Sequence, residues 1–217
     1  MYLNILSSQS ISAYSLGIKL MHSTAKSNAT VIVQFLLDQG VDVDRPSSGH
    51  CSQTPLQASL QHKFIDRGAK INAMAPTRFM GRTALQEAVE RGNMELVKYL
   101  ISKGADVNAP AVPDGGVTAL QAAAINGYLR LAQLLLLHGA DIGAEASPKY
   151  GRTAVNGAAE HGRVDMVKYL LDNYQGDKSK AQLCEAALRY ARNENEWDVI
   201  RLLKAYPESN ARRSGTN

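Results

Sequence analysis

Apolar side chains in the second half of the chain recur at the spacing of one face of an α-helix. Leucine, valine and isoleucine fall about one helical turn apart, and polar residues occupy many of the positions between them. In two successive segments these positions are Leu96, Val97, Leu100 and Ile101, then Leu131, Leu134 and Leu135. Each segment therefore predicts a short amphipathic helix with one buried face.

The same pattern returns at a spacing of 35 residues, from 83 to 118 to 153. The units begin Thr83-Ala84-Leu85-Gln86, Thr118-Ala119-Leu120-Gln121 and Thr153-Ala154-Val155-Asn156. A glycine follows each start at the same offset, at Gly92, Gly127 and Gly162. A second glycine opens Gly104-Ala105-Asp106-Val107-Asn108 and Gly139-Ala140-Asp141-Ile142. Agreement at so many fixed offsets indicates internal repeats of one structural unit.

Each unit carries the start and stop signals of two helices. A threonine with a glutamine three positions later, as in Thr83 and Gln86, predicts a capping box at a helix start. In an earlier unit Pro55 takes the first helical position, where its missing N–H is not needed. Gly92 suits the left-handed conformation that reverses the chain, and Gly104 closes the second helix. One unit therefore predicts a helix-turn-helix.

These motifs resemble the ankyrin family, whose repeats begin threonine-proline-leucine-histidine and end glycine-alanine-aspartate-valine-asparagine. The resemblance is strongest over residues 83–172, and glutamine replaces the usual histidine in three repeats. The proline- and glycine-bearing connection 109–116 is similar to those of fungal ankyrin arrays. The resemblance implies an all-α solenoid of helix-turn-helix units with short β-hairpin-like loops.

The repeat pattern also divides the chain. We expect a leader over 1–18, ankyrin repeats over 19–180, capping helices over 181–206 and a flexible tail over 207–217. The repeats are 19–53 (degenerate), 54–82 (shortened), 83–117, 118–152 and 153–180. The shortened repeat reaches Gly68 in 14 positions from Thr54 rather than 21, so seven residues are absent near His62 and Lys63. A stunted second helix or a lost piece of coding sequence would account for this gap.

The resemblance implies that first helices and loop tips form a concave face that binds a protein. The positions that map to this face are Glu87, Glu90, Arg91 and Asn93; Ile125, Asn126 and Tyr128; Glu160, His161 and Arg163; and the loop residues Arg78, Phe79 and Met80. Its exposed apolar residues beside charges would suit a protein partner. The alternative at each position is packing between repeats or an ordinary surface side chain. On the first interpretation, reversing the charges of Glu87, Glu90 and Arg91 abolishes binding with little effect on stability.

Charge, hydropathy and cysteine usage narrow the kinds of partner, site and cellular location that we expect. The formal net charge is only +4, and the predicted groove is mixed in sign, so we expect no direct nucleic-acid binding. No apolar stretch is long enough to predict a membrane span, and the first 20 residues do not read as a signal peptide. The two cysteines, Cys51 and Cys184, predict neither a disulfide framework nor a zinc site. We expect a monomer in the cytoplasm or nucleus.

Sequence signatures of catalysis are missing. The chain has no GxSxG, HExxH or GxxxxGK[ST] motif, and His50 beside Cys51 is too local to form a supported catalytic pair. We expect no metal and no cofactor. The favoured function is a non-catalytic interaction module: an adaptor, scaffold or regulator. The alternative is an accessory protein or unconventional enzyme that holds a small molecule near Ile125 and Tyr128.

Overall fold

The computed structural model describes residues 68–74 and 81–214, with side chains described as far as Pro207, and five isolated earlier positions. Those positions are Asp38, Asp42, Asp44, Thr54 and Leu56. The predicted leader and the gap near His62 lie outside the described residues, as does nearly all of the degenerate repeat. The described chain contains helices and no strand, which confirms the all-α fold class.

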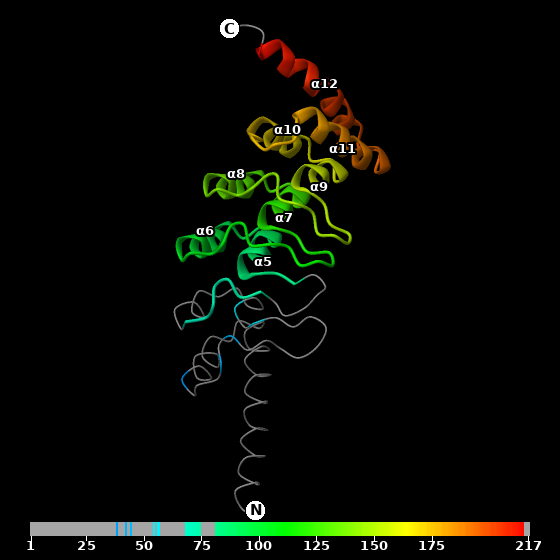
Figure 1. The fold of residues 1–217 in the computed structure, drawn as a ribbon. Helices are drawn as coiled ribbons and strands as arrows, with labels where there is room; N and C mark the ends of the chain where they lie inside the picture. The colour runs from blue at the N-terminus through cyan, green and yellow to red at the C-terminus, as the bar shows by residue number, and fades with distance from the viewer. Residues whose placement is uncertain are drawn as a thin grey trace, which may run out of the picture.

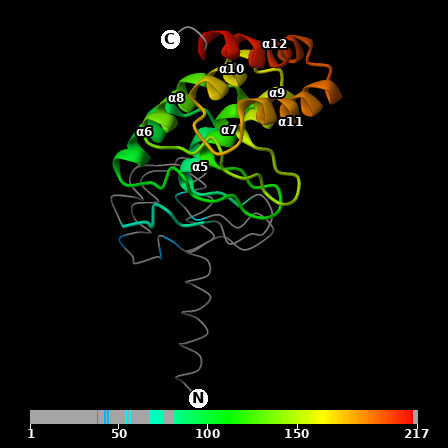
Figure 2. The same ribbon diagram turned by 45° about the horizontal axis from the view of Figure 1, so that its top comes forward.

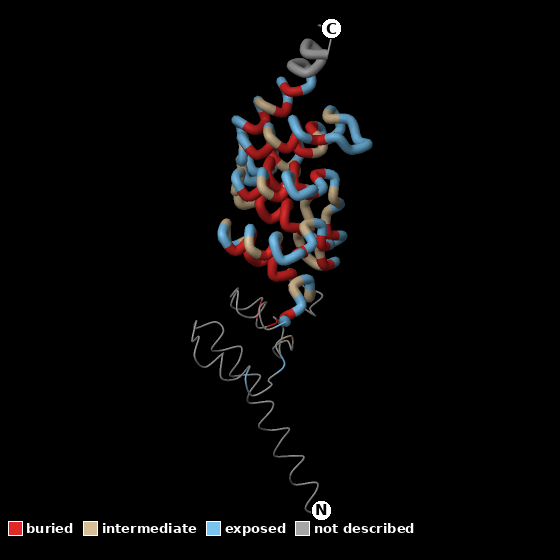
Figure 3. Tube along the Cα trace, turned by 90° about the vertical axis from the view of Figure 1, so that its left-hand side faces the viewer, coloured by how far each residue is buried: buried red, intermediate tan, exposed pale blue. Residues whose placement is uncertain are grey.

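The helices form a two-layer stack of pairs (Figure 1). The pairs are α5 (Ala84–Glu90) with α6 (Met94–Ser102), α7 (Ala119–Asn126) with α8 (Leu129–Leu137), α9 (Ala154–Glu160) with α10 (Val164–Asn173), and α11 (Lys180–Asn193) with α12 (Trp197–Ser214). The first helix of each pair packs on the first helix of the next, from α5 through α7 and α9 to α11. The second helices α6, α8 and α10 form the outer layer. Buried residues concentrate between the layers (Figure 3).

Polar caps start the inner helices as the sequence predicts. Thr83 and Thr118 form reciprocal capping boxes with Gln86 and Gln121, whereas Thr153 caps α9 without the return bond. Each glutamine also donates its amide to two loop carbonyls, at 2.9 and 3.2 Å. Those carbonyls belong to Ala109 and Pro110, and to Ala144 and Glu145. Glutamine at this position therefore both caps its helix and anchors the loop that leads to the next repeat.

Asparagine side chains tie successive turns together on the outer edge. Asn72 and Asn108 each donate to a carbonyl of the next repeat, at 3.2 and 2.8 Å, and each accepts a backbone N–H from it. The partners are Gly104 and Asp106, then Gly139 and Asp141. The equivalent position in the following repeat is Gly143, so the series of asparagine bridges ends there.

The glycine of each inter-helix turn is covered by a side chain from the next repeat. Gly92 has a φ of 68°, and a Cβ there would lie 3.0 Å from the ring of Tyr128. Gly127 has a φ of 75°, and a Cβ would lie 2.8 Å from Cδ of Arg163. A residue with a side chain would therefore be strained and would also displace its neighbour. Asn195, with a φ of 60°, holds this position in the last pair.

The closing pair is longer than the internal pairs. Helix α11 has 14 residues and α12 has 18, against seven to ten in the helices of the preceding repeats. Helix α12 contains Pro207 and continues to Ser214. The flexible tail expected from 207 stays a prediction. The preceding turns of α12 are anchored by buried Val199, Ile200 and Leu203, which fix the direction of the helix before the proline. Residues 215–217 lie outside the described region.

Truncation of the buried leucines tests the core. Leu100 and Leu135 are 0% exposed, so replacing either by alanine should lower the free energy of unfolding by about 2–5 kcal/mol through loss of burial and cavity formation. Denaturant titration followed by circular dichroism measures this loss. Leu137, 81% exposed, is the control, and its alanine variant should change stability by less than about 0.5 kcal/mol. Similar losses for all three would contradict this core.

Two glycines of one repeat separate backbone strain from contact between repeats. Gly127→Ala and Gly139→Ala both place a Cβ at positive φ, which costs about 1–2 kcal/mol. A Cβ at Gly139 meets no atom within 4 Å, whereas one at Gly127 meets Arg163. Gly127→Ala should therefore destabilise the protein more in denaturant titrations. Equal losses would mean that Arg163 moves aside at no cost.

Candidate protein-binding face

The inner helices and the loops before them form one continuous side of the stack, called the inner face below. It comprises α5, α7, α9 and α11 with the loops 109–117 and 144–152 (Figure 2). Most of the residues that the sequence assigned to partner binding lie on this side or at its turns. Arg78, Phe79 and Met80 lie outside the described residues, so their proposed role stays a prediction.

Four charged side chains at the ends and in the middle of α5 form ion pairs with one another: Arg82, Glu87, Glu90 and Arg91. Glu87 accepts a hydrogen bond from Arg91 at 2.9 Å, and its second oxygen lies 3.7 Å from Arg82. Arg82 also lies 3.5 Å from Glu90. Glu87 is only 8% exposed, although the sequence placed it among the exposed groove positions. The burial follows from its position in the middle of α5, where two guanidinium groups compensate its charge.

A second ion pair lies at α9, and its arginine also contacts the closing pair. Arg152 donates two hydrogen bonds to the carboxylate of Glu160, at 2.7 and 2.9 Å, and its guanidinium lies 4.8 Å from the ring centroid of Tyr190. The hydrogen bond to Glu160 is the main cause that raises the pKa of Arg152 above its usual value. This paired geometry fixes both side chains and links α9 to α11.

Several other predicted residues make contacts within the protein. Tyr128 covers Gly92, Ile125 lies against Gly157, and Arg163 donates from Nε to the carbonyl of Ile125 at 3.3 Å. Asn93 caps α6, Asn126 donates to the carbonyl of Ala122, and His161 contacts the carbonyl of Gly157. Tyr128 and Arg163 therefore have a packing role between repeats, which was the alternative interpretation of their positions. Partner contact by any of these residues stays a prediction.

The loops before α7 and α9 are fastened to each other. Lys149 pairs with Asp114 through a parallel bridge, in which its N–H donates to Pro113 at 3.1 Å and its carbonyl accepts from Gly115 at 2.9 Å. Its ammonium lies 3.1 Å from the carboxylate of Asp114. The hydroxyl of Ser147, which is 6% exposed, also donates across to the carbonyl of Val112 at 2.9 Å. The two loops therefore form one rigid projection beside the inner helices (Figure 1).

Tyr150 lies in this projection, directly after the bridging residue Lys149. Its side chain is 81% exposed, and its backbone adopts a φ of 59°. The equivalent residue of the preceding loop is Gly115, whose φ is 70°, so this loop has a tyrosine where the preceding loop has a glycine. Tyr150 is not among the residues that the sequence predicted to bind a partner. Alignment of the repeats offers a signal for it. Tyr150 stands three residues before Thr153, the position that Met80 and Gly115 hold before Thr83 and Thr118.

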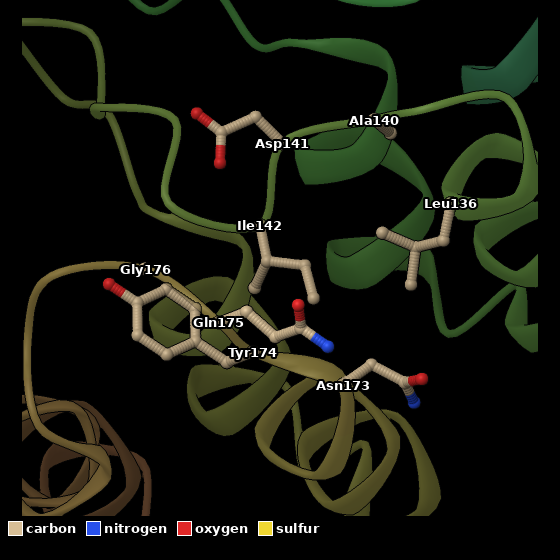
Figure 4. A pocket seen from close by; sticks show the side chains of 8 residues that line it. All are labelled: Leu136, Ala140, Asp141, Ile142, Asn173, Tyr174, Gln175 and Gly176. Carbon is tan, nitrogen blue, oxygen red and sulfur yellow. The ribbon is translucent and has the colours of Figure 1, made fainter.

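A pocket of about 370 Å³ lies on another side, where the repeat pattern breaks (Figure 4). It is lined by Leu136, Ala140, Asp141, Ile142, Asn173, Tyr174, Gln175 and Gly176. None of the residues predicted to bind a partner lines it. Over the described ranges, no three histidine, cysteine, aspartate or glutamate side chains gather as metal ligands would. Burial raises the pKa of the Cys184 thiol, which favours its protonated, unreactive form.

Comparison with known protein families accounts for the stacked pairs. A family described as ankyrin repeats, in three copies, matches residues 59–146 and 112–182, which together span more than half of the 217 residues. The protein belongs to the ankyrin-repeat family. The match confirms the resemblance carried by the Thr83, Thr118 and Thr153 motifs. No curated protein matches this ankyrin chain. None of its described helices combines the length and the apolar character needed to cross a membrane.

Removing the charge of Glu87 tests whether the ion pairs at α5 stabilise the ankyrin fold. Glu87→Gln removes the charge that Arg82 and Arg91 contact, and hydrogen bonds to charged groups contribute about 1.5–3 kcal/mol. We expect a stability loss of that order in denaturant titrations. The control is Glu95→Gln, because Glu95 is exposed and pairs with Lys98 on the outer layer, where the loss should stay below about 1 kcal/mol.

The same contacts revise the expected effect of reversing Glu87, Glu90 and Arg91 together. The triple reversal would bury a cation at position 87 beside Arg82, so it should destabilise the fold and is a poor probe of binding. If Glu87→Gln and Glu95→Gln prove equally harmless, the α5 cluster is a surface feature and this revision is wrong.

Proposed function

We propose that this ankyrin protein is a non-catalytic interaction module, an adaptor, scaffold or regulator, which binds a protein partner across the inner face and its loop tips. Ankyrin repeats are in general protein-interaction modules. The observation that carries the proposal for this chain is Tyr150, an exposed tyrosine in the left-handed conformation within two loops that are fastened to each other.

The strain at Tyr150 is informative because a glycine would remove it. A non-glycine residue in the left-handed region costs about 1–2 kcal/mol, and Gly115 shows that the loop accepts glycine at this position. The side chain is 81% exposed, so burial does not compensate for that cost. Tyrosine is enriched among residues that dominate binding energy at protein interfaces. Partner contact is a use that fits both the exposure and the strain.

Rigidity supports the same proposal. The bridge between Asp114 and Lys149, the buried hydroxyl of Ser147 and the ion pairs of Arg82 and Arg152 hold the face in one geometry. A partner that binds a preorganised surface loses less conformational entropy than one that must order flexible loops. The free inner face should therefore resemble the bound one.

The small-molecule alternative has less support. It requires a pocket formed by Ile125 and Tyr128, but the pocket of about 290 Å³ beside them is lined by Gly127, Leu129 and Arg163 among others and by neither of those side chains. The 370 Å³ pocket lies around Tyr174, away from the predicted groove residues. We also propose that the protein acts as a monomer in the cytoplasm or nucleus and does not bind nucleic acid directly, since Arg82 and Arg152 of its inner face are paired with glutamates.

Replacing Tyr150 separates binding from folding. Tyr150→Gly should leave the melting temperature unchanged or raised, because relief of about 1–2 kcal/mol of strain offsets about 0.4–1 kcal/mol of added chain entropy. Loss of an exposed aromatic anchor should weaken partner binding by about tenfold or more. Affinity purification with quantitative mass spectrometry, from cells that express the protein, compares recovery by the wild type and the variant.

The matched control is Leu137→Ser on the outer layer, since Leu137 has the same 81% exposure. It should retain the partner. Recovery of the same proteins by Tyr150→Gly and the wild type would remove Tyr150 from the interface. Absence of any specific protein with the wild type would contradict the interaction function itself.

A further inference from the structure

Two positions of the inner face switch together between charged and apolar residues from one repeat to the next. One position directly precedes the capping threonine, and the other is the seventh residue after it. In the first and third described repeats they hold the ion pairs Arg82–Glu90, at 3.5 Å, and Arg152–Glu160, at 2.7 Å. In the repeat between them they are Val117 and Ile125, which we call the apolar patch. An ionic pair is thus replaced as a pair by two apolar residues.

The apolar patch packs against the core and α9 but remains partly exposed. Val117 packs against the core, and Ile125 lies over α9, where a Cβ on Gly157 would come 2.6 Å from its Cγ1. Ala122, on the same helix as Ile125, is fully buried. Because Gly157 has no side chain, Ile125 can lie against the next inner helix. Both members of the patch keep intermediate exposure, so an apolar group can still reach them.

The two ion-pair clusters that flank the patch carry little net charge. Arg163, which is exposed and donates to the carbonyl of Ile125, adds one positive charge at the turn after α7. On one side, Glu87 and Glu90 are neutralised by Arg82 and Arg91. On the other side, Arg152 and Glu160 pair through two hydrogen bonds. Paired charges of this kind attract a charged ligand weakly, because the fields of the two signs largely cancel. Contact between these two clusters therefore favours an uncharged group over a charged one.

We propose that the apolar patch is the anchor site for one large aliphatic or aromatic side chain, carried by a segment of the protein partner that has little net charge. This inference rests on the proposed interaction function and specifies the chemistry of its partner. Val117 and Ile125 contribute apolar area, and the flanking ion pairs exclude water at the rim while they offer hydrogen bonds to the backbone of the segment.

The chain itself supplies the variant that tests this site. Val117→Arg combined with Ile125→Glu installs the pair that the adjacent repeats already hold at these positions, so the fold has a precedent for it. Ile125→Gln is a second, milder variant, and Leu137→Ser on the outer layer is the control. Circular dichroism and thermal melting of each full-length protein establish that the variants fold.

The experiment selects a displayed library of random linear peptides on the purified full-length wild type. The selected peptides should share one large apolar residue at a fixed position and carry little net charge. Their affinity should fall by about tenfold or more in the double variant and in Ile125→Gln, and stay unchanged in Leu137→Ser. Raising the salt concentration from about 50 to about 500 mM should change the affinity by less than about threefold, since screening acts on charged contacts.

The outcomes separate this inference from the function on which it rests. Peptides that bind the folded double variant as well as the wild type, or that are charged and lose affinity steeply with salt, overturn the apolar anchor while the interaction function stands. A library that yields no peptide specific for the wild type overturns both. Loss of binding in Leu137→Ser as well would place the contact on the outer layer and also overturn the patch.

Discussion

The structure depends on one repeated contact, in which a side chain of each repeat covers the turn glycine of the repeat before it. Tyr128 covers Gly92, Arg163 covers Gly127, and the carboxylate of Glu196 covers Gly162. The glycine is needed twice, for its positive φ and for the space above it. Because each repeat contacts mainly its neighbours, this contact sets the stacking of the inner helices and hence the shape of the face they present.

The stack changes at the closing pair, where the turn between the helices no longer has a glycine. In the closing pair the left-handed turn residue is Asn195, which tolerates positive φ but has a side chain where interior repeats have none. The asparagine series on the outer edge likewise stops at Gly143, and the chain beyond α10 runs through Tyr174 rather than through another turn of the Gly104 kind. The last helices are longer, and they complete the stack by packing on α9 and α10.

Repeat spacing and capping chemistry made the fold predictable, since Thr83, Gln86 and Gly92 act locally and recur at fixed offsets. The candidate site was less predictable because it depends on contacts between repeats. The burial of Glu87 requires arginines from both ends of α5, and the roles of Tyr128 and Arg163 appear only when one turn is laid on another. Tyr150 was missed because its strain is a property of the loop backbone, which shows in the sequence only when position 150 is aligned with Gly115.

Hydrogen–deuterium exchange of the intact protein, with and without the partner recovered from cells, tests the central claim most directly. Binding on the inner face predicts added protection in the loops 109–117 and 144–152 and in α7, and little change in α6, α8 and α10. Protection confined to the outer helices, with the two loops unchanged, would contradict a partner bound on the inner face.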